Sequence, residues 1–453
     1  MTRELFGHPR GLTVLFGTEM WERFSYYGMR ALLVLYLTKY LFLRPHVETV
    51  LFYPQVKAFF EMMAGPLEAQ PFSSLIYGTY TGLIYATPLL GGWLADNVLG
   101  QRNTVMIGIV MMAFGHFMMA FQSMLFVALL LLIFGGGLFK TNTTAQVGML
   151  YTAGDSRRDR AYSVFYVGVN LGAFIAPLIA GTLGETVGWH YGFGAAGVGM
   201  LLALAVYVAG WKHLPPERER AAKTKQQTQH QKFTLPEWKS IGALVLLVLP
   251  LTLWWACYEQ QGNIITLFAD ANTDRRLIPG LIDWQIPVTW FQAFNPFFIF
   301  SLTPLLLALW VRQAKKGTEP NSIIKIVNGC ACLTASYMLI AWASWHDGGG
   351  QTSWLWLFLF FALITIGEIQ LSPISLSLFS KVAPLRIASL MMGVVFLPNF
   401  LGGGLLQGYL GTYWGGMTHP LFFLMMAAIG AVSGIIIWSL DKPLRPYLET
   451  RHD

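Results

Sequence analysis

Four ionisable side chains stand close together in an apolar stretch near the start of the chain. They are the acids Glu19 and Glu22 and the bases Arg23 and Arg30. At 3.6 residues per turn, these side chains share one broad face of a helix. An ionisable side chain at the middle of a bilayer costs at least roughly 2.5–3.5 kcal/mol, so each needs a reason to be there.

Three more charges occur inside later apolar stretches, namely Lys140, Glu259 and Glu368. All the buried cations precede the middle of the chain, and two of the acids follow it. This division is typical of a site for a ligand with a carboxylate at one end and an ammonium at the other. The alternative is a set of ion pairs that only holds the helices together. Buried pairs stabilise poorly, because desolvation can exceed their attraction.

The composition indicates what surrounds these charges. Of 453 residues, 55% are hydrophobic and only 12% are charged, and the mean hydropathy is +0.51. A soluble domain carries roughly 25% charged residues, so this chain could not cover a water-exposed globule. The three cysteines, an odd number, and the aperiodic Gly and Pro exclude disulfide-stapled and collagen-like chains. The composition predicts an all-α polytopic membrane protein.

Twelve stretches are long enough to span a bilayer, which takes about 20 residues each. They lie near 12–38, 72–95, 103–121, 124–150, 161–184, 190–211, 238–262, 287–311, 322–345, 353–381, 387–412 and 418–439. Residues 39–71, which contain Pro45, Pro54 and Pro66, are expected to form a mixed loop. The polar stretch 212–237 is the expected cytoplasmic linker between an N-terminal six-helix bundle, 1–211, and a C-terminal one, 238–453, which includes a short cytoplasmic tail. This layout resembles the major facilitator fold.

The distribution of basic residues predicts the orientation. With a cytoplasmic N-terminus, 22 of the 30 Lys and Arg fall on the cytoplasmic side and 5 on the other. We therefore expect both termini in the cytoplasm of a cell whose plasma membrane the chain crosses many times. The net charge of +7 is then a signal of topology, and a nucleic-acid partner is not expected.

Several motifs resemble those of the proton-dependent oligopeptide transporters, and bacterial members in particular. The first helix reads Glu19-x-x-Glu22-Arg23-Phe24-x-Tyr26-Tyr27-Gly28, which is similar to the family's helix 1 signature. Departures from the family pattern are Thr141 in place of Pro and Tyr258 in place of Phe. The other matching runs are Phe139-Lys140-Thr141-Asn142, Phe165-Tyr166-Val167-Gly168-Val169-Asn170-Leu171-Gly172, Trp255-Ala256-Cys257-Tyr258-Glu259-Gln260-Gln261-Gly262 and Gly367-Glu368-Ile369-Gln370-Leu371-Ser372-Pro373.

The resemblance implies a substrate site for di- and tripeptides. Arg23, Arg30 and Lys140 would receive the peptide carboxylate, with Tyr27 and Tyr85 at the same end. Glu368 would receive the peptide ammonium, helped by Asn170 and Asn295. Permissive side-chain pockets would involve Trp255, Tyr26 and Tyr166 with nearby apolar residues. Ser372, in the helix 10 motif, is a further substrate-binding candidate.

The resemblance also implies that protons drive the transport. Glu22 near Lys140, and Glu259 near Arg30, would form switchable pairs, with Glu19 and Arg23 in the same coupling set. A fixed latch is the alternative role for Glu259. Protons would be the coupling ion, and no metal, nucleotide or other cofactor is implied. We expect a monomer in the bacterial inner membrane.

Two positions bear on how protons are handled. Gly78 follows Tyr77 where animal members have a histidine linked to protonation, so this chain cannot use that histidine. His116 is a possible replacement, although a lone histidine on a membrane helix is more often a hydrogen-bonded packing residue.

Residues 217–232 form either an amphipathic helix on the membrane or an unstructured linker.

Two other functions compete with peptide symport. A proton-coupled carrier of another small solute, such as nitrate or a modified peptide, would share the fold, but Glu368 would then lack an ammonium to meet. An intramembrane enzyme is the other class. The sequence offers no metal-ligand set, no Ser-His or Ser-Lys pairing in adjacent helices and no pair of membrane Asp residues for it.

Overall fold

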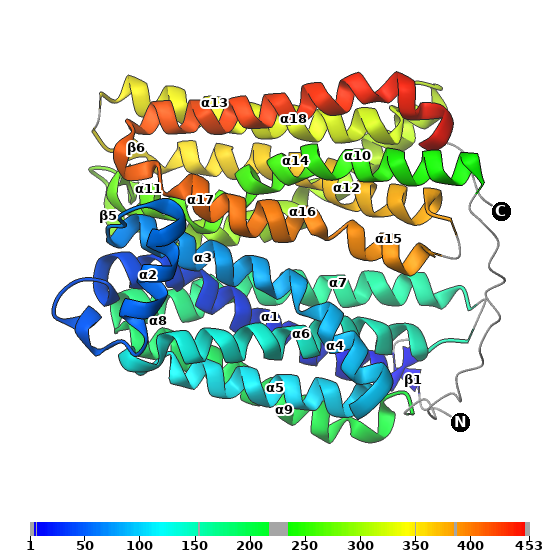
Figure 1. Cartoon of the computed structure of the whole chain (residues 1–453), viewed down its shortest axis with the longest axis horizontal. Coiled ribbons are helices and arrows are strands. Elements are labelled where there is room, and N and C mark those ends of the chain that lie inside the picture. The colour runs from blue at the N-terminus through cyan, green and yellow to red at the C-terminus, as the bar shows by residue number, and fades with distance from the viewer. Residues whose placement is uncertain are drawn as a thin grey trace. The chain divides into compact units, whose positions relative to one another are not determined.

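Long α-helices form along nearly all the apolar stretches, as the computed structural model shows (Figure 1). It describes residues 4–5, 7–152, 155–216, 234–348, 350–384 and 387–448. A helix pairs its own backbone N–H and C=O groups, as lipid requires. Within those ranges, nine helical segments are long and apolar enough to cross a membrane. They are Gln122–Met149, Arg157–Thr186, Trp189–Ala209, Leu235–Ala271, Val288–Lys315, Ser322–His346, Trp354–Val382, Leu390–Gly416 and His419–Pro443.

The remaining three predicted spans are helical but more polar. Residues 12–38 lie largely in α1 (Arg10–Tyr36), which carries the charged face. Residues 72–95 fall mainly in α3 (Ala69–Ala86) and α4 (Pro88–Leu94), and residues 103–121 largely in α5 (Gln101–Met118). The count of twelve spans therefore stays a prediction.

The chain folds into two units. The first contains residues 1–73, 83–223 and 286–296, and the second contains residues 74–82, 224–285 and 297–453. In the first unit α5 packs against α6 and α9, and α1 packs against α7 and α9 (Figure 1). Besides α1, α4 and α5, its elements are β1 (Glu4–Leu5), β2 (His8–Pro9), η1 (Leu37–Leu41), η2 (His46–Thr49), α2 (Tyr53–Ala64), η3 (Ala95–Leu99), η4 (Gln122–Met124), α6 (Leu125–Met149), α7 (Arg157–Ala176), η5 (Pro177–Gly181), α8 (Thr182–Thr186), α9 (Trp189–Ala209), η6 (Trp211–His213) and η8 (Val288–Ala293).

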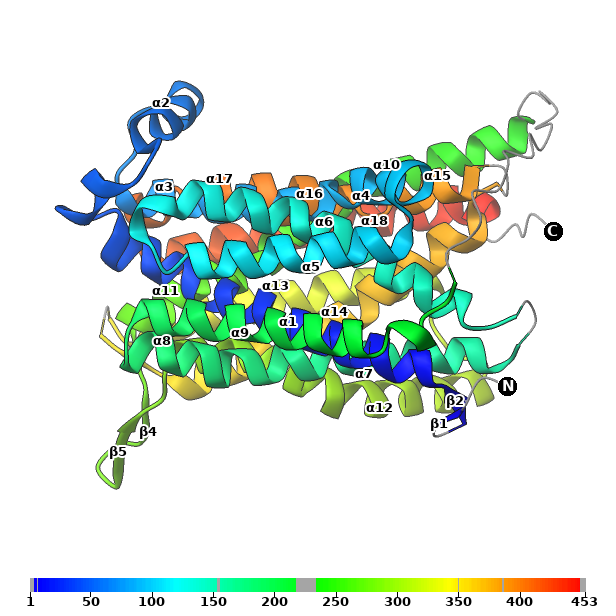
Figure 2. The same ribbon diagram turned by 90° about the horizontal axis from the view of Figure 1, so that it is seen from below.

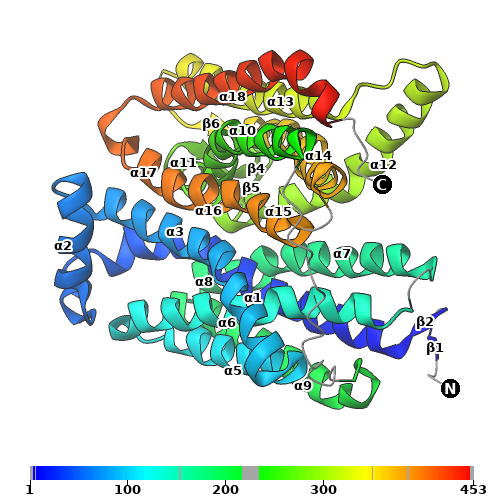
Figure 3. The same cartoon turned by 45° about the vertical axis from the view of Figure 1, so that its right-hand side comes forward.

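In the second unit α13 packs against α14 and α18, and α10 packs against α18. The short helices α15 to α17 follow one another along the chain (Figure 3). Its elements are α10 (Leu235–Tyr258), η7 (Glu259–Gly262), α11 (Ile264–Ala271), β3 (Thr273–Asp274), β4 (Arg276–Ile278), β5 (Ile282–Gln285), most of α12 (Phe294–Lys315), α13 (Ser322–His346), β6 (Thr352–Ser353), α14 (Trp354–Val382), α15 (Ala388–Val394), α16 (Leu397–Phe400), η10 (Leu401–Leu406), α17 (Gln407–Gly411), η11 (Trp414–Gly416) and α18 (His419–Leu448).

The strands are short and make only two-stranded pairs among the described residues. β1 pairs with β2 and β4 pairs with β5, both antiparallel, while β3 pairs with β6 in parallel. The β4–β5 hairpin is visible in Figure 2. These pairs join loops and helix ends, so they do not form a core.

Two of the irregular helical segments occur at Pro or Gly, which interrupt the regular helix. η5 begins at Pro177, and η10 contains Gly402, Gly403 and Gly404. Inside α10, the carbonyl of Pro250 accepts a hydrogen bond of 2.7 Å from the Ser433 hydroxyl of α18. This hydrogen bond links α10 to α18 at the proline.

The prediction of an irregular loop over residues 39–71 is wrong for residues 53–64. This stretch is α2, which lies at the end of the first unit away from the N-terminus (Figure 2). Pro54 stands in the first turn, where its missing N–H is no loss. Its presence is therefore a helix-start signal, although it was read as a loop signal.

The predicted linker is described only at its two ends. Arg102 donates a hydrogen bond of 2.7 Å to the carbonyl of Pro215. At the other end, α10 begins at Leu235 after a capping box formed by Thr234 and Glu237. Residues 217–233 lie outside the described residues, so the choice between an amphipathic helix and an unstructured linker stays open.

Candidate functional site

The charged face of α1 forms a buried cluster of ion pairs in the first unit. Arg23 donates through Nε to Oε2 of Glu22 at 2.5 Å and through Nη2 to Oε1 of Glu22 at 2.8 Å. The same Nε lies 3.2 Å from Oε1 of Glu19. These three residues are only 2–6% exposed. Glu19, Glu22 and Arg23 therefore share one face of α1, because one guanidinium contacts both acids. The place of Arg30 on that face stays a prediction.

A hydroxyl from another helix completes this cluster. Thr143 of α6 donates to Oε2 of Glu19 at 3.1 Å. Lys140, one turn earlier on α6, lies within electrostatic reach of Glu19 as well. A buried charge needs such partners to offset its desolvation. The sequence analysis missed Thr143, although its position three residues after Lys140 on a helix was a usable signal.

Aromatic rings accompany the cations of the first unit. Lys140 Nζ lies 4.2 Å from the ring centre of Tyr85, and the Arg23 guanidinium lies 5.2 Å from that of Tyr26. Arg30 lies 6.0 Å from the ring of Tyr27. A cation over an aromatic face is stabilised by the ring quadrupole, more strongly where water is excluded. The fold therefore brings Lys140 and Tyr85 together from different helices.

The remaining predicted site residues of the first unit are Asn170 and Tyr166 on α7 and Asn295, which follows η8. Asn170 is buried and donates to the carbonyl of Tyr166 in its own helix at 3.0 Å. The side chain of Tyr166 is 53% exposed. Asn295, at the start of α12, is half-buried. Their predicted contacts with a peptide stay predictions.

In the second unit, the predicted residues Trp255 and Glu259 lie near the end of α10, and Glu368 lies in α14. The rings of Trp254 and Tyr258 stack at 4.8 Å, and Trp255 meets Tyr258 edge-on at 5.2 Å. Glu259 and Glu368 both lie within electrostatic reach of the Tyr258 hydroxyl. Tyr258 therefore brings a hydroxyl near both acids, which the Phe that is usual in the family would lack.

Glu259 is held where α10 changes from α-helix to the 3-10 turn η7. Its carbonyl accepts a hydrogen bond of 3.2 Å from Gln407 of α17. Gln260, next in the chain, donates to the carbonyl of Gln407 at 2.9 Å. The Glu259 side chain is 4% exposed and packs where Gly403 leaves space. Gln407 was not singled out from the sequence, because nothing in the spacing links it to α10.

The proposed switchable pairs are not decided by these contacts. Glu22 is bound to Arg23, and Lys140 lies over Tyr85. Ser372 of α14 is half-buried. His116 is buried, and its Nδ1 makes no hydrogen bond with the described part of the chain. The expected hydrogen-bonded packing role of His116 is thus not seen at that atom.

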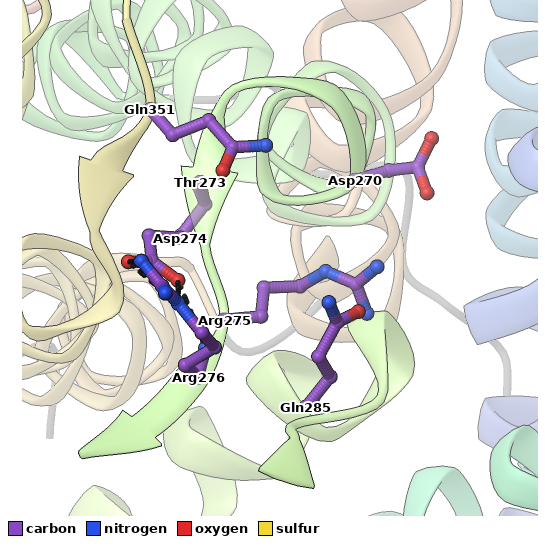
Figure 4. A pocket seen from close by; sticks show the side chains of 7 residues that line it. All are labelled: Asp270, Thr273, Asp274, Arg275, Arg276, Gln285 and Gln351. Atoms are coloured by element: carbon purple, nitrogen blue, oxygen red, sulfur yellow. Dashed lines mark hydrogen bonds and ion pairs between the residues drawn. The ribbon is translucent and has the colours of Figure 1, made fainter. Parts of the chain in front are cut away.

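A polar pocket lies at the end of α11, and none of the predicted substrate residues lines it (Figure 4). Its volume is about 400 Å³. In it, Arg276 donates to Asp274 through Nε and Nη2 at 2.9 and 2.7 Å. These hydrogen bonds, with burial opposing them, hold the pKa of Asp274 below its usual value. The lining residues are Asp270, Thr273, Asp274, Arg275, Arg276, Gln285 and Gln351.

The described ranges contain no group of three or more His, Cys, Asp or Glu placed to hold a metal ion. Cys257, Cys330 and Cys332 are free thiols. The charged side chains of the first unit and those of the second unit can bind groups of opposite charge and exchange ion-pair partners.

Known proteins are similar to this chain over nearly its whole length. The model of the POT family matches residues 102–231 and 216–413. The peptide transporter YePEPT of Yersinia enterocolitica is 32% identical over 515 residues, covering 98% of this chain and 96% of the relative. A di-/tripeptide transporter of Lactococcus lactis subsp. cremoris is also 32% identical, covering 98% of this chain and 97% of the relative.

Solved structures agree with these sequence matches. The crystal structure of a mutant peptide transporter POT in complex with alafosfalin superposes with a TM-score of 0.83 at 30% identity. The match covers 99% of this chain and 96% of that chain. The likeness therefore extends to the arrangement of helices over the full length.

Proposed function

The chain belongs to the POT family, and we propose that it is a proton-coupled symporter that imports di- and tripeptides by alternating access. Family membership makes it a multi-pass transporter of the major facilitator fold and not an enzyme. The observation that carries the proposal is the buried cluster of Glu19, Glu22 and Arg23, in a chain similar over its full length to peptide transporters.

In the proposed site, the two termini of the peptide are recognised by charge. Arg23, Arg30 and Lys140 bind the carboxylate, since a guanidinium can make two parallel hydrogen bonds to it. Glu368 binds the ammonium. Tyr27 and Tyr85 line the carboxylate end, and Asn170 and Asn295 assist Glu368 at the ammonium end. Tyr26, Tyr166 and Trp255 form permissive side-chain pockets, which makes the specificity broad. Ser372 is a further substrate-binding residue.

Proton coupling is proposed to use the acids beside these cations. The substrate carboxylate competes for a cation, and the acid that loses its partner takes up a proton. Glu259 with Arg30, and Glu22 with Lys140, are the proposed pairs, with Glu19 and Arg23 adjoining. The three contacts of Arg23 and Thr143 with the α1 acids support a network in which partners can be exchanged. The protein would act as a monomer in a bacterial inner membrane, with both termini cytoplasmic.

The first experiment measures uptake of labelled dialanine into proteoliposomes under an inward proton gradient. Accumulation above equilibrium that an uncoupler abolishes is the expected result. No dialanine uptake by folded, inserted protein would contradict the proposal and direct the search to nitrate or modified peptides.

A variant separates coupling from binding. Glu259→Gln should retain counterflow, which exchanges substrate without net proton movement, while proton-driven uptake falls at least tenfold. The matched control is Glu68→Gln, which changes an exposed carboxylate and should leave both activities unchanged. Loss of counterflow together with uptake would contradict the coupling role of Glu259.

A further inference from the structure

One carboxylate in the first unit holds the beginning of a distant helix. Glu185 of α8 accepts hydrogen bonds from the backbone N–H groups of Val288 and Thr289 at 2.8 and 2.7 Å. It also accepts one from the Thr289 hydroxyl at 2.6 Å. These donors are the first residues of η8, about a hundred residues further along the chain. This contact plays no part in the peptide site or in the coupling set.

The chemistry of the contact suits a helix start. The first N–H groups of a helix lack partners within it, and the N-terminal end carries a partial positive charge. η8 runs directly into α12, so Glu185 caps the start of a long helical segment. Hydrogen bonds to an ionised acceptor are roughly twice as strong as neutral ones.

Further contacts bring the same two elements close together. Trp290 donates through Nε1 to the Thr182 hydroxyl at 2.8 Å. Gly181 leaves room for Thr289, because a Cβ there would lie 2.2 Å from the Thr289 hydroxyl oxygen. Thr289 is fully buried and Val288 is 2% exposed. The start of η8 is therefore shielded from water while the contact is formed.

The contact joins segments from both predicted halves of the chain. Glu185 precedes the predicted linker at 212–237, whereas η8 follows it. Residues 286–296 belong to the first unit, but α12 continues into the second unit from Phe297. Both elements lie on the predicted outer side of the membrane. If η8 moves with α12 when the predicted halves part on that side, the Glu185 contact breaks.

We propose that Glu185 is a latch that holds η8 against α8 while the outer side of the carrier is closed, and that it releases η8 when that side opens. The inference rests on alternating access, which is part of the proposed function. Glu185 is a positioning residue in this role, since it acts through η8 and does not contact the peptide. Its half-buried place at a helix end lets water solvate the carboxylate once it is released, so breaking the contact is reversible.

The test uses a cysteine beneath the latch. Val288→Cys is introduced into the full chain after the three native cysteines are replaced by serine, and labelling by a membrane-impermeant maleimide is followed in proteoliposomes. Val288→Cys keeps its backbone N–H and leaves Thr289 intact. Adding Glu185→Gln is expected to accelerate labelling at least fivefold, because an amide is uncharged and offers a single acceptor oxygen. Equal labelling rates with and without Glu185→Gln would overturn the proposal.

The matched control is Glu61→Gln. Glu61 also accepts a backbone N–H bond, from Leu67 at 2.9 Å, but this joins neighbouring segments of the chain. Its loss should leave labelling of Val288→Cys unchanged. An equal acceleration by Glu61→Gln would mean general loosening and would also overturn the latch.

A second variant covers the case in which Glu185→Gln does not fold. Thr289→Val removes one of the three donors and keeps the carboxylate, so labelling should accelerate about twofold to threefold; no acceleration in monodisperse protein would contradict the latch. The labelling assay needs no substrate. Accelerated labelling without dialanine uptake would therefore leave the latch standing while the peptide proposal fails, and uptake without accelerated labelling would do the reverse.

Discussion

Two short segments leave the unit that contains their chain neighbours, and they are held by different means. Residues 74–82 of α3 belong to the second unit, where Gly78 and Gly82 pack against the backbone of Gly404. A Cβ on Gly404 would lie 2.2 Å from Cα of Gly82. Residues 286–296 belong to the first unit, where the carboxylate of Glu185 accepts three hydrogen bonds.

The difference concerns how each contact responds to change. A backbone-to-backbone contact between glycines depends on shape. An added methyl group fits there only if the two helices move apart. A carboxylate contact depends on direction and charge, and water can replace its partners when it opens. The glycine contact should therefore be sensitive to added volume, and the Glu185 contact to loss of hydrogen-bonding capacity.

The largest expected effect comes from Gly404→Ala. The new methyl group meets backbone atoms of Gly82, which have no room to shift, so we expect a stability loss of about 3 kcal/mol. Dialanine uptake should fall at least tenfold. Thermal unfolding and proteoliposome uptake measure both. Gly416→Ala is the control, since a Cβ there has no atom within 4 Å; similar losses in the two variants would contradict the packing argument.

A smaller effect is expected from Gly181→Ala in the other segment. Here the new methyl group meets only side-chain atoms of Thr289 and no backbone atom, so the loss should be about 1–2 kcal/mol. Adding Thr289→Ala should recover part of that loss by removing the closest atom. Gly194→Ala, with open space around it, serves as the control. A loss as large as that of Gly404→Ala would remove the distinction between the two segments.

The smallest effect is expected from Arg276→Gln, which tests a carboxylate held only by a near neighbour. The Asp274 pKa is low because Arg276 hydrogen-bonds to its ionised form, so the variant should raise that pKa toward its usual value of 3.8. Stability from this pair is complete above the unfolded pKa and is lost as pH falls through the lower folded pKa. The pair is partly exposed, so overall stability should hardly change. A carboxyl-carbon NMR titration of Asp274 checks the shift, and an unchanged pKa would contradict it.

Much of the local structure could be predicted because helical periodicity fixes near neighbours. Glu19, Glu22 and Arg23 were expected on one face, and they form one cluster. Phe24, which follows Arg23, packs with Ala176 and Ala180. The apolar stretches were expected to be helices, and most boundaries agree with the structure to within a few residues.

Other features depended on contacts between residues far apart in the chain. Thr143 reaches Glu19 only because α6 packs beside α1, and Gln407 reaches the Glu259 backbone only because α17 packs beside η7. α2 was missed because its proline was read as a loop signal, although Pro54 starts the helix. Tyr258 was noted only as a departure from the family pattern, without a role.

The sequence by itself determined the membrane class, the helical segments and the charged face of α1, because hydropathy and the 3.6-residue period act over a few turns. It also carried the motifs that identify the family. Only the tertiary structure decided that Glu185 meets η8 and that Gly78 and Gly82 meet Gly404. The physical reason is that such pairings depend on how whole helices pack, and local spacing does not encode which distant helix becomes the neighbour.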